Sequence, residues 1–165
     1  MSQGKILISD HSDNYLLKLI GDVRLTLSAP LNRYMETLFD NNNVKRVVVD
    51  MLDTEGVDST TLGLIAKLGL HCRKHYQINL ELFCQNQSIL RTLECMGFDD
   101  IIDIFQQLPD INGELNSLEM TDADIGEVRQ QVLESHKLLE QLNPQDSAEF
   151  TDLIHALESD LDANR

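Results

Sequence analysis

The chain has 165 residues, of which 42% are hydrophobic and 25% are charged, and its formal net charge is -15. This composition supports one globular domain with an additional segment and excludes a wholly disordered chain. The acidic balance argues against nucleic-acid and anionic-membrane partners, because binding phosphates requires clustered lysine and arginine. The sequence has no apolar run of about 18 residues. Its first apolar run, residues 6–8, is too short for a signal-peptide core, so we expect a cytoplasmic protein.

The negative charge is concentrated in the second part of the chain. Residues 1–113 carry 10 basic and 15 acidic side chains, a net charge of -5. Residues 114–165 carry 3 basic and 13 acidic side chains, a net charge of -10. We therefore divide the chain into a domain over 1–113 and an acidic extension over 114–165.

The first 41 residues predict two strands and a helix. Apolar-rich runs at 5–9 and 14–20 predict strands that pair antiparallel, because no helix separates them. A stripe of apolar residues at helical spacing then predicts a helix over about 29–41. Thr26 or Ser28 is expected to cap its N-terminus.

A hydroxyl lies at the start of the next predicted helix. The β-branched run over 45–51 predicts a buried strand, which a polar loop joins to an apolar helix over about 59–76. Functional groups of α/β folds commonly follow the carboxyl end of a strand. Two interpretations of Ser59 remain open. Its hydroxyl is either a helix N-cap, which contributes about 1 kcal/mol, or a phosphorylation switch, since free helix N–H groups accommodate a phosphate.

The remainder of the first domain continues the alternation of strands and helices. A strand is expected over 78–84, and a helix over 89–96 is expected to begin after an N-cap at Ser88 and to stop at Gly97. Residues 101–105 predict a last short strand. The pattern predicts an α/β fold with a mixed β-sheet and helices packed on it.

The extension over 114–165 predicts a C-terminal acidic helical hairpin. Its first apolar stripe runs from Ile125 to Leu142 and skips Ser135, and its second runs from Phe150 to Leu161. Each stripe is narrow, so neither helix is expected to be stable alone. Three roles remain open: a lid beside the loop at Ser59, a second contact that includes oligomerisation, and a packing element that stabilises the domain.

Motifs of catalysis and metal binding are missing from the sequence. It contains no G-x-S-x-G, no P-loop and no G-x-G-x-x-G. His71 and His75 are four residues apart on a helix, but no glutamate completes an H-E-x-x-H motif, so we expect packed or solvated histidines. The acidic cluster at 99–103 is expected to be a solvated loop. We expect no metal, no cofactor and no enzymatic activity. Reduced, buried thiols are expected at Cys72, Cys84 and Cys95.

Residues 4–107 resemble the STAS domain of bacterial anti-sigma factor antagonists. The order of strands and helices is similar, and the D-S-x-x-L-G motif at 58–63 opens the apolar helix after a strand that ends in Asp50. The segment L-I-G-D at 19–22 is similar to the family's L-x-G-acidic segment. Residues 93–98 resemble the family's L-x-x-x-G-hydrophobic helix end.

This resemblance implies a non-enzymatic switch. The unphosphorylated form would bind an anti-sigma factor or a serine kinase, and phosphorylation of Ser59 would release that partner. A serine phosphatase would restore the binding form. ATP would be bound by the kinase, so the chain itself would need no cofactor. The alternative is a structural or scaffold STAS subunit of a signalling complex, in which Ser59 is not modified.

Two departures from the family pattern affect the predicted site. The family usually has D-S-S-G-L-G, whereas Thr61 replaces the first glycine here, so Thr60 and Thr61 remain alternative acceptors. The family's early G-E-L-D segment is G-D-V-R here, which places Arg24 where an acid is usual. The predicted partner-binding residues are Asp22, Arg24, Asp58, Ser59, Thr60 and Thr61.

Overall fold

The computed structural model describes residues 3–109, 114–118 and 125–142. Within them, seven strands form one sheet in the order β6-β5-β3-β2-β1-β7, and β4 pairs with β2 off this path. The strands are β1 (Lys5–His11), β2 (Asn14–Val23), β3 (Arg46–Asp50), β4 (Thr54–Val57), β5 (Glu81–Phe83), β6 (Asp103–Phe105) and β7 (Asn116–Ser117). The β1–β2 pair is antiparallel, and β3, β5 and β6 run parallel to β2, which confirms the mixed sheet.

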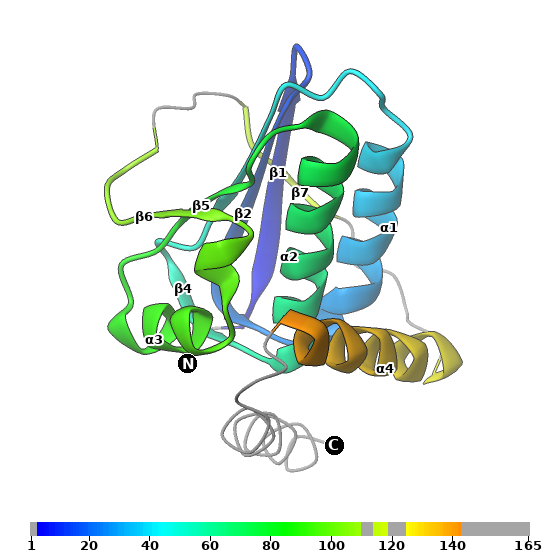
Figure 1. Cartoon of the computed structure of the whole chain (residues 1–165), viewed down its shortest axis with the longest axis vertical. Coiled ribbons are helices and arrows are strands. Elements are labelled where there is room, and N and C mark those ends of the chain that lie inside the picture. Colours follow the sequence, from blue (N-terminus) through cyan, green and yellow to red (C-terminus); the bar gives the residue numbers. More distant parts are fainter. Residues whose placement is uncertain (1–2, 110–113, 119–124, 143–165) are drawn as a thin grey trace.

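The helices cover one face of this sheet (Figure 1). They are α1 (Ser28–Phe39), α2 (Ser59–His71), α3 (Gln87–Cys95) and α4 (Ile125–Leu142). A π-helical turn, Cys72–Tyr76, continues α2. Figure 1 shows α1 and α2 side by side on the sheet, with α4 crossing the end at which α2 begins. None of the described helices is both long and apolar enough to cross a membrane.

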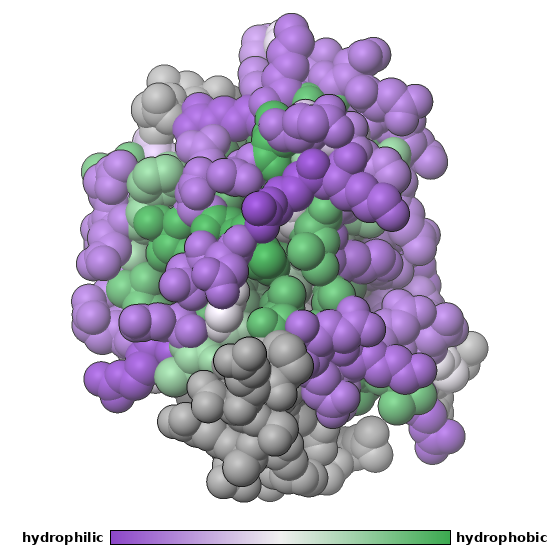
Figure 2. Space-filling model, in the orientation of Figure 1, coloured by the Kyte–Doolittle hydropathy of each residue, from purple (hydrophilic) through white to green (hydrophobic). Residues whose placement is uncertain are grey.

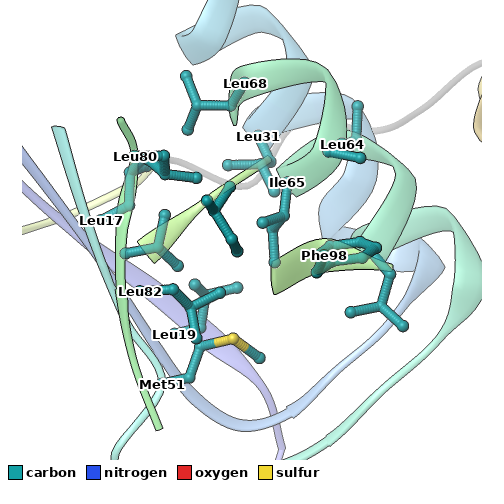
Figure 3. Close-up of a cluster of buried hydrophobic side chains, with 14 of the residues drawn as sticks. Leu17, Leu19, Leu31, Met51, Leu64, Ile65, Leu68, Leu80, Leu82 and Phe98 are labelled. Carbon is teal, nitrogen blue, oxygen red and sulfur yellow. The ribbon is translucent and has the colours of Figure 1, made fainter. Parts of the chain in front are cut away.

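The core lies between the sheet and the helices. Successive strand residues point to opposite faces of a sheet, so Leu17 and Leu19 of β2 both face the helical layer. Figure 3 shows them beside Leu82 of β5 and opposite Ile65 of α2. Burying a leucine or isoleucine side chain contributes about 1.5–3 kcal/mol. This apolar layer therefore holds α2, and with it the start of α2, in a fixed position on the sheet.

The loop expected between the strand at 45–51 and the helix at 59 contains the strand β4. Its four residues, T-E-G-V, carry no apolar run or alternation, so periodicity did not reveal it. β4 lies parallel to the end of β2, pairing Val57 with Val23, and the Thr54 hydroxyl donates to the carbonyl of Leu19 at 2.7 Å. This pairing brings the start of α2 next to residues 22–24.

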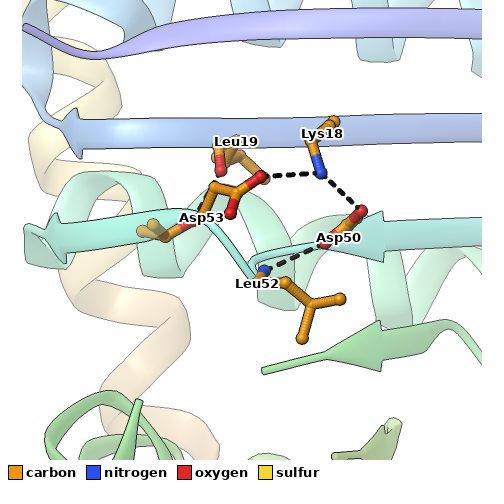
Figure 4. Close-up of polar contacts among 6 residues, drawn as sticks. Lys18, Leu19, Asp50, Leu52 and Asp53 are labelled. Carbon is orange, nitrogen blue, oxygen red and sulfur yellow. Dashed lines mark hydrogen bonds and ion pairs between the residues drawn. The ribbon is translucent and has the colours of Figure 1, made fainter. Parts of the chain in front are cut away.

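A partly buried ion pair supports the turn that leads into β4. Lys18 of β2 is directly opposite Asp50 of β3, and its Nζ lies 3.0 Å from Asp50 Oδ2 and 3.1 Å from Asp53 Oδ2 (Figure 4). Asp50 Oδ1 also accepts a hydrogen bond from the N–H of Leu52. Burial opposes the charge of Lys18, but hydrogen bonds to the two carboxylates outweigh it and raise the Lys18 pKa.

Two predicted helix caps are wrong. A 3-10 turn, Leu25–Leu27, precedes α1, and the Ser28 hydroxyl donates back to the Leu25 carbonyl instead of capping the helix, while Thr26 also supplies no cap. In α3 the N-cap is Asn86, whose side-chain oxygen accepts from the N–H groups of Ser88 and Ile89. The cap therefore lies two residues earlier than expected, and the N–H of Ser88 is itself one of the capped donors.

The thiols and histidines have structural surroundings. Cys72 and Cys84 are buried as expected, and burial raises the pKa of Cys72 to about 12. The expectation for Cys95 is wrong, because it ends α3 on an exposed position. The His71 ring stacks on Phe39, with ring centroids 3.8 Å apart, and the tilted ring of His75 lies 4.3 Å from it. Among the described residues, no group of three or more His, Cys, Asp or Glu side chains could hold a metal ion.

We predict that Lys18→Met lowers the free energy of unfolding by about 3 kcal/mol, because it leaves the buried Asp50 carboxylate without its cation. Urea denaturation monitored by circular dichroism measures the change. Asp53→Asn is the control. Its carboxylate is mostly exposed, so its loss should cost less than about 1 kcal/mol. Equal midpoints for Lys18→Met and the wild-type chain would contradict the assigned role of this ion pair.

Candidate functional site

Asp58, not Ser59, caps the N-terminus of α2. Its backbone is extended, with φ -105° and ψ 175°, and its Oδ1 accepts a hydrogen bond of 2.9 Å from the N–H of Thr61. Its carbonyl accepts the N–H of Leu62, as the first intrahelical bond requires. The interpretation of Ser59 as the cap is therefore wrong. Ser59 is the first residue of the helix, and α2 remains capped whatever its hydroxyl does.

The Asp58 carboxyl group is buried, and the contacts that favour its charge offset this burial only in part. Asp58 is 0% exposed, and its Oδ2 accepts no hydrogen bond within the described part of the chain. Burial raises the pKa of Asp58, while the hydrogen bonds from Thr61 and the positive charge of Arg24 act in the opposite direction. The start of α2 thus contains a carboxylate whose charged form is disfavoured.

The end of β2 lies against this helix start. Arg24 Nε donates to both carboxylate oxygens of Asp22, at 2.9 and 2.8 Å. Gly56 of β4 leaves room for the pair, because a Cβ there would lie 2.7 Å from Asp22 Oδ1. The Thr61 hydroxyl is 3.4 Å from the Val23 carbonyl, to which it donates. The fold therefore brings together the residues that the sequence predicted at this surface, from β2 and from α2.

The three hydroxyls of the motif have different surroundings. Thr61 is tied to β2 through Val23, so its side chain helps to hold two elements together. The Thr60 hydroxyl is buried and makes no hydrogen bond to the described residues. Ser59 Oγ faces α4 and lies 3.2 Å from Nε2 of His136. Ser59 is therefore the hydroxyl of the motif whose hydrogen-bonding contact comes from a helix near the end of the chain.

Helix α4 lies directly over the first turns of α2. Ser135 Oγ donates to the carbonyl of Thr60 at 3.1 Å. Gly63 makes this approach possible, because a Cβ there would lie 2.2 Å from the Cβ of Ser135. Leu139 is completely buried in the core, and Glu127 forms an ion pair of 2.9 Å with Arg33 of α1. Under this cover Ser59 is 0% exposed.

Sequence reasoning missed Ser135 and His136 as parts of this site. They lie more than 70 positions from Ser59, and no local pattern links the two segments. The signal that could have found Ser135 was the interruption that it makes in the apolar stripe of its helix. A small polar residue on the buried side of an amphipathic helix marks a place where that helix lies close to another backbone.

The contact between α4 and α2 is close in shape but incompletely hydrogen-bonded. Gln131 is 4% exposed, and neither Oε1 nor Nε2 has a hydrogen-bond partner within the described residues. The hydroxyl of Thr60, whose carbonyl contacts Ser135, also has no hydrogen-bond partner within the described residues. A hollow of about 270 Å³ also remains between the two helices, lined by Leu64, Leu138 and neighbouring residues. A buried polar group without a hydrogen bond costs about 1–3 kcal/mol, so these features weaken the packing of α4 on α2.

The hydroxyl–imidazole contact does not form a working nucleophile in this conformation. A serine beside a histidine is the first requirement of nucleophilic catalysis. The Ser59 hydroxyl is enclosed by α2 and α4, however, and a substrate must reach a nucleophile in order to react. The geometry instead describes a hydroxyl at a helix N-terminus that another helix covers.

The architecture defines a small α/β domain with a hydroxyl-bearing helix start at the carboxyl end of its strands. Residues 5–111 match the model of the STAS domain, and the chain belongs to that family. The match ends before α4 begins. The comparison with curated proteins gives no match.

Two solved structures share the fold. One is a candidate anti-sigma factor antagonist of Thermotoga maritima, 18% identical, with a TM-score of 0.54, 61% of this chain covered and 86% of that one. The other is an anti-sigma factor antagonist of Mycobacterium paratuberculosis, 15% identical, with a TM-score of 0.55, 64% of this chain covered and 88% of that one. At these identities the likeness concerns the fold.

We predict that Asp58→Asn makes unfolding less dependent on pH. Asparagine keeps the cap but does not titrate. Since burial raises the Asp58 pKa above its ordinary value, the folded wild-type chain binds more protons than the unfolded chain between the two pKa values. Wild-type stability should therefore fall, relative to Asp58→Asn, as pH rises from about 4.

Urea denaturation between pH 4 and 7 measures the difference in unfolding free energy between Asp58→Asn and the wild-type chain. The exposed substitution Asp99→Asn provides the background. A difference that stays constant over this range, or shrinks as pH rises, would show that burial of Asp58 does not disfavour its charge.

Proposed function

We propose that the protein is a phosphorylation-switched antagonist of an anti-sigma factor or a related regulator. In its unphosphorylated form it binds and sequesters that regulator, which is an anti-sigma factor or a serine kinase. A phosphate on Ser59 releases the partner, and a serine phosphatase restores the binding form. The chain acts in the cytoplasm as a non-enzymatic binding module, and ATP is bound by the kinase. Membership of the STAS family supports this reading.

The observation that carries the proposal is that the helix cap and the proposed phosphate acceptor are different residues at the start of α2. Asp58 supplies the cap, so the hydroxyl of Ser59 is not needed to begin the helix. A phosphate on Ser59 would sit at the positive end of α2, beside N–H groups that helices leave without intrahelical partners. The modification therefore leaves the cap intact, and the domain keeps its fold while its surface changes.

The electrostatic effect on a partner follows from the groups nearby. Asp22 and Arg24 pair with one another, so their charges largely offset. A phosphate adds close to two negative charges to this surface at neutral pH. A partner that presents acidic or apolar groups here is repelled or loses its desolvated contact. The change in charge alone is enough to lower affinity without a change of fold.

Ser59 is a better acceptor than its two neighbours. Phosphorylation of Thr61 would break its hydrogen bond to the Val23 carbonyl and separate α2 from β2. The Thr60 carbonyl holds Ser135, and its hydroxyl is buried without a hydrogen bond to the described residues. Within the described residues, the Ser59 hydroxyl has its hydrogen-bonding contact with the imidazole of His136, which belongs to α4 and not to the sheet.

One observation favours the alternative, a structural or scaffold STAS subunit without a switch. Ser59 is completely covered by α4, and in this conformation neither a kinase nor a partner reaches it. In a scaffold the Ser59–His136 contact would simply help to hold α4 in place. The two functions differ in whether residue 59 is ever phosphorylated and in whether its charge controls binding.

We predict that Ser59→Glu lowers affinity for the regulator at least tenfold, because it brings negative charge to the docking surface, whereas Ser59→Ala retains binding. The partner is first captured with Ser59→Ala as bait and identified by mass spectrometry. Its affinity for each purified variant is then measured by calorimetry. Mass spectrometry of the protein from its own cells tests whether residues 59–61 carry phosphate.

Ser88→Glu is the matched control, because Ser88 also lies in the first turn of a helix, α3, but is exposed and away from this surface. It should bind like the wild-type chain. Equal affinities for Ser59→Glu and Ser59→Ala, together with unphosphorylated residues 59–61, would favour the scaffold.

A further inference from the structure

The helix α4 occupies the surface that the proposed switch needs. Ser135 contacts the carbonyl of Thr60, and His136 contacts the hydroxyl of Ser59, so two successive residues of α4 cover two successive residues of the motif. Ser135 also fills the space beside Gly63 in the second turn of α2. A Cβ on Gly63 would overlap the side chain of Ser135. A kinase or a docked regulator cannot contact Ser59 while α4 lies there.

The interface between α4 and α2 favours one packing arrangement. Gly63 supplies the close approach, Ser135 supplies a small side chain that donates a hydrogen bond, and Leu139 is buried in the core one turn further along α4. Ser135 and Leu139 lie four residues apart on one face of α4, and Gly63 of α2 lies opposite Ser135, as expected for two helices that pack in a definite register. The contact is therefore a specific intramolecular interface.

The same interface also has features that favour release. The Gln131 side chain is buried without hydrogen bonds to described residues, and a hollow remains beside Leu64 and Leu138. Lifting α4 would give the Gln131 amide access to water. The outer side of α4 is polar over most of its length, and Figure 2 shows mainly hydrophilic residues in its region. Hydration of the Gln131 amide therefore offsets part of the free energy that opening loses in apolar contacts.

We propose that α4 is an autoinhibitory lid that occupies the partner-docking surface, so that kinase and regulator reach Ser59 only after α4 has lifted from α2. This inference rests on the proposed function only in naming a kinase and a regulator as the proteins that must reach Ser59. The lid itself is a property of this chain and can be measured without either of them. In the closed form the domain is folded but unable to bind, and in the open form it is ready for both binding and modification.

The lid is tested by the accessibility of a thiol at position 59. The chain carries Ser59→Cys together with Cys95→Ser, which removes the exposed native thiol and leaves the buried Cys72 and Cys84. The reaction rate with the reagent 5,5′-dithiobis(2-nitrobenzoate) is then measured in the native buffer. In the closed chain this rate should be at least tenfold below that of the same chain unfolded in urea.

Two substitutions, one on each side of the interface, should open the lid. Ser135→Lys places a long side chain against Gly63, and Gly63→Ala places a Cβ against Ser135. Each should raise the labelling rate at least tenfold. Leu133→Lys introduces the same residue on α4 at a position that is 61% exposed, and it should leave the rate unchanged. Circular dichroism and thermal unfolding establish that each variant retains the folded domain.

The result that would overturn the lid is a labelling rate that neither Ser135→Lys nor Gly63→Ala changes while both variants remain folded. A closed chain that reacts as fast as the unfolded chain would overturn it equally, because α4 would then give no protection.

A second measurement separates the lid from the proposed function. Purified chains that retain Ser59 are incubated with a cell extract of the native organism, ATP and phosphatase inhibitors. The initial rate at residue 59 should be at least fivefold higher for Ser135→Lys than for Leu133→Lys. Equal rates, in variants whose thiols differ in accessibility, would overturn gating of the kinase. Absence of phosphate in every variant would reject the switch and leave the lid to be judged by labelling.

Discussion

The hydrogen bond from the Thr61 N–H to the Asp58 carboxylate determines what the rest of the site can do. This bond fixes the residue at which α2 begins. Because the capping side chain belongs to Asp58, which precedes the helix, the hydroxyl of Ser59 is not needed for capping. The bond is made at a cost, because the carboxylate is buried and one of its oxygens accepts nothing from the described residues. The neighbouring elements reduce that cost. Arg24 contributes a favourable charge from the end of β2, and β4 holds the loop so that this charge lies close by.

Supports for this helix start extend through the sheet. The ion pair of Lys18 with Asp50 fixes the turn after β3, and that turn leads into the strand β4. β4 then pairs with the last residues of β2 and delivers the chain to Asp58. The apolar layer around Leu19 and Ile65 holds α2 on the sheet. The functional group at the start of α2 is thus positioned by the strands and the apolar core beneath it, as is common for functional groups on loops.

Local patterns in the sequence were sufficient for most of the elements and insufficient for their contacts. Antiparallel pairing of the first two strands followed from the missing helix between them, and the helix at 59 followed from its apolar run. β4 could not be found this way, since its four residues obtain their conformation from pairing with β2. The cap was assigned one residue too late because a serine and an aspartate are equally good caps and stand side by side. The lid was one of three roles considered for the acidic extension, and the contacts of Ser135 and His136, which place α4 over Ser59, could not be found from local patterns. The second predicted helix, from Phe150 to Leu161, lies outside the described residues.

The attachment of α4 to the same chain as its binding surface has a quantitative consequence for any competitor. A tethered segment meets its site as an intramolecular event, at an effective concentration that does not depend on the concentration of the protein. An external regulator must therefore bind the open form strongly enough to compete with α4, which stays attached to the chain at any protein concentration. Its apparent affinity equals its intrinsic affinity multiplied by the open fraction, so a chain that is open about 1% of the time binds about a hundredfold more weakly. Small changes at the contact between Gly63 and Ser135 would then set the concentration of regulator to which the protein responds, while the docking surface itself stays the same.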